Sequence, residues 1–440
     1  MSEEKILDFK KLEGDFEELK KEIGEPTIED FEHLQKIEFW GTLSNIIGYA
    51  TSWLIPFNIF SAFLLSFANL TRWANVAHPV LHGGYDKIEG VPKRYKKKNF
   101  AKYGRRYLDW IDWVEPSAWD YEHNKMHHYH LGEKTDPDNV ERNMYWLHNM
   151  KIPMFLKYII VILFSFIWKF AYYAPNTLKL LINQENKRKG KKEENSYLTW
   201  EAFSPFTERG WRLWSDSYLP YFIFTFIIKP LPFLWLLGEQ AYYNSLGAFI
   251  IAELITNFHS FLVIVPNHSA KDIYCFDTPH KSKGEFYYRQ IMGSVNYKTG
   301  GDFNDALHGW LNYQIEHHLF PNIPLSQYQK LQPKIKEFCE NNHIPYREDS
   351  VWKRLKMSID LMVGKDKLLI WEDYIKENNI KVISGKEDAN ITTEEFVMEM
   401  QKTEKVVQTD NTEIIKERRN SELVFDDIEN DRRKGDLDES

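Results

Sequence analysis

Long apolar segments alternate with charged segments through the middle of the chain. Five apolar segments can be distinguished, at residues 43–57, 59–77, 152–173, 218–238 and 241–266. The first two are separated only by Asn58 and contain a single charge, Arg72, so they predict a tight helical hairpin. Three of the five segments approach or exceed the roughly 20 apolar residues that span a bilayer, which favours a membrane protein over a soluble protein with buried helices.

The charged remainder of the sequence divides the chain into four parts. A charged segment of residues 1–38, which lacks the pattern of a signal peptide, precedes an expected membrane domain of residues 39–345. Residues 346–384 predict amphipathic helices. Residues 385–440 are rich in charged and polar residues and poor in aromatic ones, which is typical of a disordered tail.

Cysteine content and charge narrow the environment of the protein. The only two cysteines, Cys275 and Cys339, cannot form a disulfide framework, which fits segments that face a reducing cytosol. The formal net charge of -8 argues against a nucleic-acid partner. Basic runs are confined to residues 93–106 and 187–192. The first run could attract anionic lipid headgroups, dock an acidic electron donor, hold the phosphates of a thioester, or simply be solvated.

Three histidine clusters carry the chemistry of the chain. They are His78 and His82, then His123, His127 and His128, then Gln314, His317 and His318. A spacing of four residues places two imidazoles on one face of a helix, where both can reach a metal ion. Seven histidines exceed the needs of one ion, so the clusters predict two ions. Because imidazole suits iron, copper, zinc and nickel, ligand type leaves the metal open.

A shared metal site requires all three clusters on one side of the membrane. Five spanning helices would separate the third cluster from the first two, so residues 152–173 are expected to lie in the interface or to dip back. The basic run at residues 187–192 favours the cytosolic side. We therefore expect an all-α integral membrane protein with four transmembrane helices in two hairpins and a cytosolic, histidine-rich helical cap.

The third cluster resembles a known motif. Residues 311–321 read LNYQIEHHLFP, which resembles the third histidine box of membrane fatty acid desaturases of the acyl-lipid and front-end type. The order of boxes and apolar hairpins agrees with this family over residues 40–345. The resemblance implies an enzyme of the endoplasmic reticulum membrane with its boxes facing the cytosol. It further implies a di-iron site of two non-haem Fe²⁺ ions that uses O2 to introduce a double bond into a lipid acyl chain.

The resemblance also implies which residues hold the iron. The implied ligands are His78, His82, His123, His127, His128, His268, Gln314, His317 and His318. His259, inside the last apolar segment, is an alternative, whereas His130, His148, His280 and His308 are expected to be ordinary hydrogen-bonded histidines. Polar neighbours of the boxes could accept the outer N–H of a ligating imidazole. They are Glu122, Asp136, Asp138, Glu141, Asn267, Asp302, Asp305 and Glu316.

Two departures from the family pattern affect what is expected. The first box has Pro79 after His78, where the front-end type commonly has Asp. Residues 1–38 lack the His-Pro-Gly-Gly haem motif of a fused cytochrome b5 domain. Electrons are therefore expected from a separate cytochrome b5 and its NADH-dependent reductase.

Two other functions remain open at this stage. The same scaffold could carry a di-iron hydroxylase, or a desaturase of a sphingolipid or sterol, because the metal site does not fix the product. A metal-binding membrane protein or transporter without oxidative activity is the third reading. An ion path would place polar groups at the membrane midplane, whereas these histidines cluster at helix ends, which argues against transport.

Overall fold

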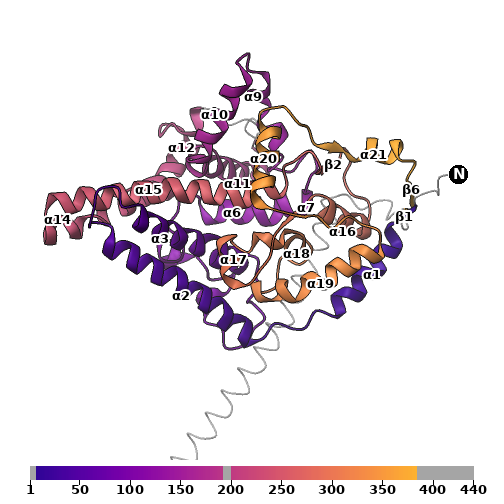
Figure 1. Ribbon diagram of the computed structural model, residues 1–440, viewed down its shortest axis with the longest axis horizontal. Coiled ribbons are helices and arrows are strands. Elements are labelled where there is room, and N and C mark those ends of the chain that lie inside the picture. Colours follow the sequence, from indigo (N-terminus) through magenta and orange to yellow (C-terminus); the bar gives the residue numbers. More distant parts are fainter. Residues whose placement is uncertain (1–5, 192–199, 384–440) are drawn as a thin grey trace, which may run out of the picture. The chain divides into compact units, whose positions relative to one another are not determined.

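The computed structural model describes residues 6–191 and 200–383. These residues form helices joined by short turns, with three two-stranded pairings at their edges (Figure 1). The helical class predicted from the sequence is therefore confirmed. The predicted disordered tail, residues 385–440, lies outside the described residues.

The first hairpin consists of two helices that pack against each other. Helix α2 (Ile28–Thr51) is followed by α3 (Ile59–Leu70), the π-helical turn η1 (Thr71–Ala77) and the short helix α4 (His78–Leu81). Asn58 makes the reversal, because its side-chain oxygen accepts from the Ser61 N–H at 3.1 Å while its amide donates to the Thr51 carbonyl at 2.8 Å. Outward-facing apolar side chains, among them Phe57 at 70% exposure, surround this turn.

The second hairpin runs from Glu208 to Asn267 and carries two helices long and apolar enough to cross a membrane. The first contains α12 (Glu208–Leu213), η7 (Trp214–Tyr218), α13 (Leu219–Phe222), η8 (Ile223–Ile228) and α14 (Leu231–Leu237). The second contains α15 (Glu239–Ile264) and η9 (Val265–Asn267). Gly238 joins them at a φ of 92°, a backbone conformation that favours glycine. The predicted second hairpin is thus present.

The predicted four-span topology is not confirmed. Within the described residues only the second hairpin meets the length and composition of membrane spans, with a third span if one bent pair is counted. Helix α2 falls short because its first turns carry charges such as Glu29, Asp30 and Lys36. The continuous run from α3 through η1 to α4 contains polar residues and the charge of Arg72. The bent pair is the segment predicted to dip back: α10 (Met154–Ser165) meets the helix of residues 169–188 at 87°.

Short elements between the hairpins and after them complete the fold. Those before the second hairpin are η2 (Lys93–Tyr95), η3 (Tyr103–Arg105), α5 (Arg106–Asp109), α6 (Pro116–Tyr121), η4 (Glu122–His127), α7 (His128–His130), α8 (Val140–Asn143), α9 (Tyr145–Asn149), η5 (Lys169–Tyr173), α11 (Ala174–Arg188) and η6 (Trp200–Ala202). Those after it are α16 (Lys283–Met292), α17 (Asp302–Leu307), η10 (Leu311–Tyr313), α18 (Gln314–Leu319), α19 (Leu325–Asn341), α20 (Val351–Met362) and α21 (Trp371–Glu377).

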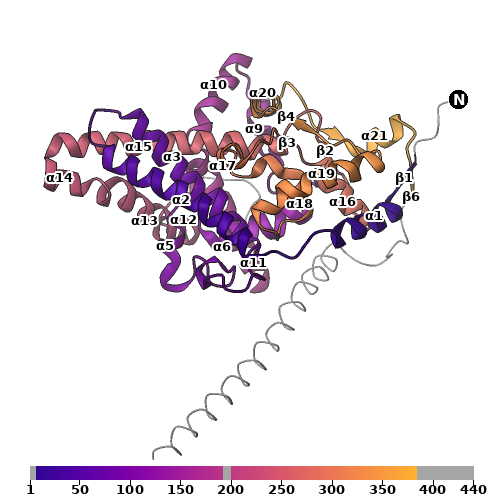
Figure 2. The ribbon, with the colours of Figure 1, turned by 60° about the horizontal axis from the view of Figure 1, so that its bottom comes forward.

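Both ends of the described chain pack against the region after the second hairpin. Strand β1 (Ile6–Asp8) pairs in parallel with β6 (Lys381–Ile383), and β2 (Tyr274–Cys275) and β3 (Asn296–Tyr297) pair with β5 (Leu369–Ile370) and β4 (Glu348–Asp349). Helix α1 (Phe9–Lys21) lies beside α16 and α19 (Figure 2). Its Phe16 ring stacks on Tyr287 at 3.7 Å between ring centroids and on Phe320 at 5.0 Å.

The contact between α1 and α16 leads to a testable prediction. A Cβ atom at Gly284 would lie 1.9 Å from the Phe9 carbonyl oxygen, so Gly284→Ala must push α1 away. We expect a loss of about 1–3 kcal/mol of stability, as for other overpacked sites, together with faster tryptic cleavage in residues 10–21. Gly14→Ala on α1 is the matched control, because a Cβ there meets nothing within 4 Å. Equal thermal stability and equal cleavage in the two variants would contradict this packing.

Candidate metal centre

Each histidine cluster lies where a helix changes its geometry. His78 opens α4 directly after the π-helical turn η1, and Pro79 is the second residue of this short helix. The second cluster lies on the π-helical turn η4 and on α7, and the third lies on α18. π-Helical turns are rare and occur frequently at functional sites. His268 follows η9, at the end of the second apolar hairpin.

Four histidines from all three clusters form a first group. His78, His82, His123 and His317 each offer one ring nitrogen, and these four atoms lie within 4.8 Å of one another. Nε2 of His78 is 3.1 Å from Nε2 of His123 and 3.2 Å from Nε2 of His317. Residues more than 200 positions apart in the sequence therefore meet at one point.

A second group lies beside the first. The ring nitrogens of His127, His268 and His318 also lie within 4.8 Å of one another. His128 stands between the groups: its Nε2 is 3.3 Å from Nε2 of His123, and its ring stacks on His318 at 4.4 Å between centroids. All eight predicted histidine ligands are thus brought together.

Gln314 lies beside His268, with its amide nitrogen toward the histidines. Its Nε2 is 2.8 Å from Nε2 of His268, and its Oε1 accepts from Nδ2 of Asn267 at 3.0 Å. In this orientation the oxygen, which is the atom of an amide that binds cations, is directed to Asn267. The predicted neighbour Asn267 therefore holds Gln314 in place.

The protonation state of the histidines fits a metal ion. Burial lowers the pKa of His78 and of His268 to about 3. Burial also lowers the pKa of the other clustered histidines apart from His127, namely His82, His123, His128, His317 and His318. Neutral imidazoles whose Nε2 atoms face each other bring acceptor lone pairs together. Nε2 of His82 is buried and finds no hydrogen-bond partner among the described residues. A bound cation satisfies such converging lone pairs.

Outer hydrogen bonds orient several of these rings. Nδ1 of His268 donates to the Gly293 carbonyl at 2.8 Å, and Nδ1 of His318 donates to Oε1 of Gln290 at 2.9 Å. Nδ1 of His317 donates to the hydroxyl of Tyr328 at 3.2 Å. The Tyr328 hydroxyl can accept because it donates its own proton to the Phe320 carbonyl at 3.2 Å. A proton fixed on Nδ1 leaves the Nε2 lone pair for the metal.

Among residues 6–191 and 200–383, Asp136 supplies the one carboxylate at hydrogen-bond distance from a histidine of the two groups. Its Oδ1 lies 3.0 Å from Nδ1 of His127, and its carboxylate also accepts from the Gly132 and Asp138 N–H groups. Burial alone would raise the pKa of Asp136, but His127 and these N–H groups hold it below its usual value. Burial alone would lower the pKa of His127, but Asp136 outweighs it and the pKa is raised.

The other predicted acceptors lie at different distances from the histidines. An oxygen of Asp138 is 3.6 Å from Nδ1 of His127. The remaining carboxylates make other contacts: Glu122 with Tyr173, Glu141 with the Leu368 N–H, Asp302 with Lys36 and Gln329, Asp305 with Asn312 and Tyr313, and Glu316 with Asn296 and Tyr346. Asp136 is therefore the acidic neighbour whose role in the site follows directly from geometry.

Residues outside the boxes also contribute, and the sequence did not single them out. Gln290 bridges the site, since its Oε1 accepts from His318 and its Nε2 donates to the His128 carbonyl at 3.2 Å. Gln290 and Tyr328 lie on the amphipathic helices α16 and α19, where nothing marks a polar residue as functional. The only sequence feature that could have indicated Tyr328 is its position shortly after the third box.

The remaining histidines stand apart from the two groups. Nε2 of His259 donates to the Leu307 carbonyl at 2.7 Å, so the alternative ligand lies elsewhere. The others make hydrogen bonds of their own: His130 and His280 with Glu133, His148 with the Leu361 carbonyl, and His308 with the Asn304 carbonyl.

Comparison with known proteins gives one family. The family described as fatty acid desaturase matches residues 51–350. An acyl-lipid (9-3)-desaturase of Physcomitrium patens is 27% identical over 187 residues, which cover 39% of this chain and 34% of the moss protein. An NADPH-dependent stearoyl-CoA 9-desaturase of Mycobacterium tuberculosis is 24% identical over 335 residues, which cover 72% of this chain and 69% of that protein.

A third relative has the same breadth of match as the moss protein. A Delta(5) fatty acid desaturase of Caenorhabditis elegans is 29% identical over 180 residues, covering 37% of this chain and 40% of the nematode protein. The chain thus spans well under half the length of two of these three relatives. No solved structure matches the chain.

The contact between Asp136 and His127 predicts how tightly metal is held. Asp136→Asn keeps the shape of the side chain but removes the charge behind the imidazole, so we expect metal affinity to fall by roughly 10- to 100-fold. Metal content after dialysis against a graded chelator measures this change. Glu141→Gln is the control, since Glu141 accepts from the Leu368 N–H and contacts no histidine of the two groups in the described part of the chain. Unchanged retention in Asp136→Asn would show that this carboxylate does not support a metal ligand.

Proposed function

The chain belongs to the fatty acid desaturase family, and we propose that it introduces a double bond into the acyl chain of a lipid using O2. The observation that carries this proposal is the meeting of histidines from all three boxes in two adjacent groups. The moss and nematode relatives, named as acyl-lipid and fatty acid desaturases, support an acyl chain as the substrate.

We propose two Fe²⁺ ions as the metals of the two groups. His78, His82, His123 and His317 would hold one, and His127, His268 and His318 the other, with His128 between them and Gln314 hydrogen-bonded to His268. When bound, such an iron pair supplies the oxidising power, derived from O2, that an unactivated C–H bond requires.

The residues of the chain hold and shield this centre. Of the eight histidines, five are at most 7% exposed: His78, His127, His128, His317 and His318. The Trp119 ring stacks on His123 at 4.6 Å and meets His78 edge-on at 5.6 Å between centroids. This aromatic wall keeps water from one side of the first group, and the outer hydrogen bonds fix the rings before substrate arrives.

The partners and the location of the enzyme follow from the same proposal. We propose that a separate cytochrome b5, with its NADH-dependent reductase, delivers the electrons, and that the boxes face the cytosol from the endoplasmic reticulum membrane. The apolar hairpin of residues 208–267 supports a membrane location. Two cysteines without a disulfide support a cytosolic face for their segments.

Expression in yeast tests the proposed reaction. We expect a new double bond in cellular fatty acids with the intact chain and none with His317→Ala, because that imidazole joins the first group. Mass spectrometry of fatty acids, sphingoid bases and sterols locates the product. His308→Ala is the matched control and should retain activity, since His308 bonds to the Asn304 carbonyl and packs beside Tyr297, outside both histidine groups.

The outcomes of this experiment separate the candidate reactions. A hydroxyl in place of a double bond would mark a hydroxylase on the same scaffold, and a product confined to sphingoid bases or sterols would replace the acyl substrate. Equal product from the intact chain and from His317→Ala would contradict the assignment of the first group. Metal-dependent stability with no altered lipid in any class would favour a metal-binding protein without oxidative activity.

A further inference from the structure

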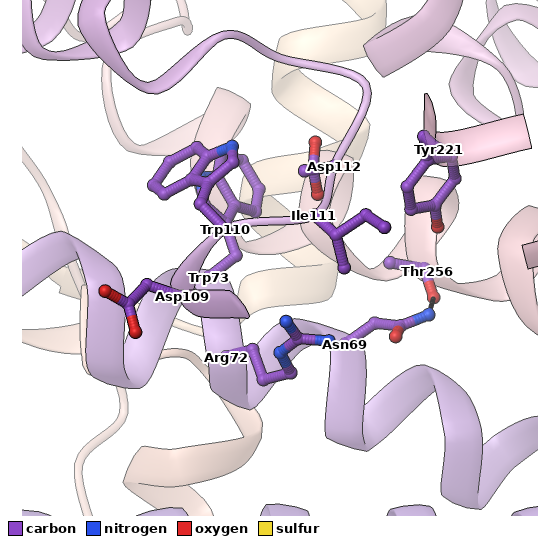
Figure 3. Close-up of a pocket in the computed structure, with 9 residues that line it drawn as sticks. All are labelled: Asn69, Arg72, Trp73, Asp109, Trp110, Ile111, Asp112, Tyr221 and Thr256. Atoms are coloured by element: carbon purple, nitrogen blue, oxygen red, sulfur yellow. Dashed lines mark hydrogen bonds between the residues drawn. The ribbon is translucent and has the colours of Figure 1, made fainter. Parts of the chain in front are cut away.

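A small pocket beside the second hairpin contains an arginine without a counter-ion. Arg72, Asn69 and Trp73 come from α3 and η1, and they face the loop of residues 109–112 and Thr256 of α15 (Figure 3). Arg72 is exposed and forms no ion pair within residues 6–191 and 200–383. It is also the only charge in the apolar run of residues 43–77, where an unpaired guanidinium is costly without an anionic partner.

The acidic residues of the pocket are already neutralised. The Asp109 carboxylate is held by the Arg105 guanidinium, including a contact of 2.9 Å from Nε. The Asp112 carboxylate lies 2.6 Å from Nζ of Lys169. The side chains that line this pocket and their ion-pair partners therefore leave one net positive charge, on Arg72.

The depth of the pocket in the membrane follows from helix length. The span of residues 208–237 has 30 residues, which at 1.5 Å per residue is roughly 45 Å, against a hydrocarbon thickness of about 30 Å. Its apolar end is at Leu237. Four of its five charges, Glu208, Arg209, Arg212 and Asp216, are in the first nine residues, and the fifth is Lys229. This charged end therefore extends into the headgroup layer.

A short turn is attached to this charged end. Arg106 donates to the Asp216 carbonyl at 2.8 Å, and the Tyr107 hydroxyl reaches the same oxygen at 3.4 Å. The turn of residues 102–108 thus lies at headgroup depth and continues directly into the pocket at Asp109. It exposes aromatic and apolar tips, Tyr103 at 91% and Leu108 at 72%, next to the exposed Lys102. Aromatic and basic side chains are characteristic of the membrane interface.

We propose that Arg72 and the turn of residues 102–108 form a binding site for the phosphate of a phospholipid headgroup. The Arg72 guanidinium offers a planar fork of N–H donors that matches phosphate oxygens. Lys102 adds positive charge to the turn, and Tyr103 and Leu108 would contact the glycerol and the upper acyl chains. The site is separate from the histidine groups, and it does not require that the bound phospholipid be the substrate.

Binding of a soluble short-chain lipid to the purified full-length chain tests this site. Dihexanoylphosphatidate should bind saturably and raise the thermal stability, whereas dihexanoylglycerol, which lacks the phosphate, should not. Arg72→Gln should weaken the affinity at least tenfold, and Arg72→Lys by less, because lysine keeps the charge but loses the fork. Arg188→Gln is the matched control, since Arg188 is another exposed arginine at the end of α11 and outside the pocket.

Further measurements identify the source of the phosphate and distinguish a loss of binding from misfolding. Coenzyme A is the second probe: if it binds at Arg72 while the phosphatidate does not, the lipid assignment is overturned. Tyr103→Ser with Leu108→Ser changes only exposed tips, so the fold should survive, and the phosphatidate should bind more weakly. Equal phosphatidate binding in the wild type and Arg72→Gln, or equal binding of the phosphate-free lipid, would also overturn the proposal. None of these measurements depends on desaturation.

Discussion

The convergence of imidazole nitrogens is the constraint on which the rest of this structure depends. Acceptor lone pairs held 3.1–3.3 Å apart repel one another unless a cation lies between them. Burial strengthens this need for a cation, because it lowers the pKa of rings such as His78 and His268 and keeps them neutral. The surrounding helices must therefore hold the rings by their outer nitrogens, and Asp136, Gln290, Tyr328 and the Gly293 carbonyl do so.

The helices that hold the imidazole rings are of two kinds. The first box ends an apolar hairpin, and His268 ends another, so both stand at the boundary between apolar helices and the polar region beyond them. The second and third boxes lie on short helices that have little stability of their own. Packing of α6 and α11 against η4, and of α16 and α19 against α18, provides the stability that these short helices lack.

Features with a local pattern could be predicted from the sequence, and features that depend on distant packing could not. The spacing of the boxes marked seven of the histidines, and the resemblance to membrane fatty acid desaturases added His268. The four-span topology is not confirmed, because helix α2 extends the first apolar segment back into charged turns and η1 adds Arg72 and polar residues to the second. Gln290 and Tyr328 could not be predicted, since their role arises only when α16 and α19 pack against the third box.

The packing of α1 also determines the order in which the protein can assemble. Phe16 is synthesised early, but its partners Tyr287 and Phe320 are synthesised only after both apolar hairpins, and β6, which pairs with β1, comes later still. Domains tend to fold from the N-terminus as the ribosome releases them. Here α1 has no packing partners until the chain beyond both apolar hairpins has been synthesised. The region around the third box therefore closes last, so the histidines of that box stay accessible to solvent until the chain is nearly complete.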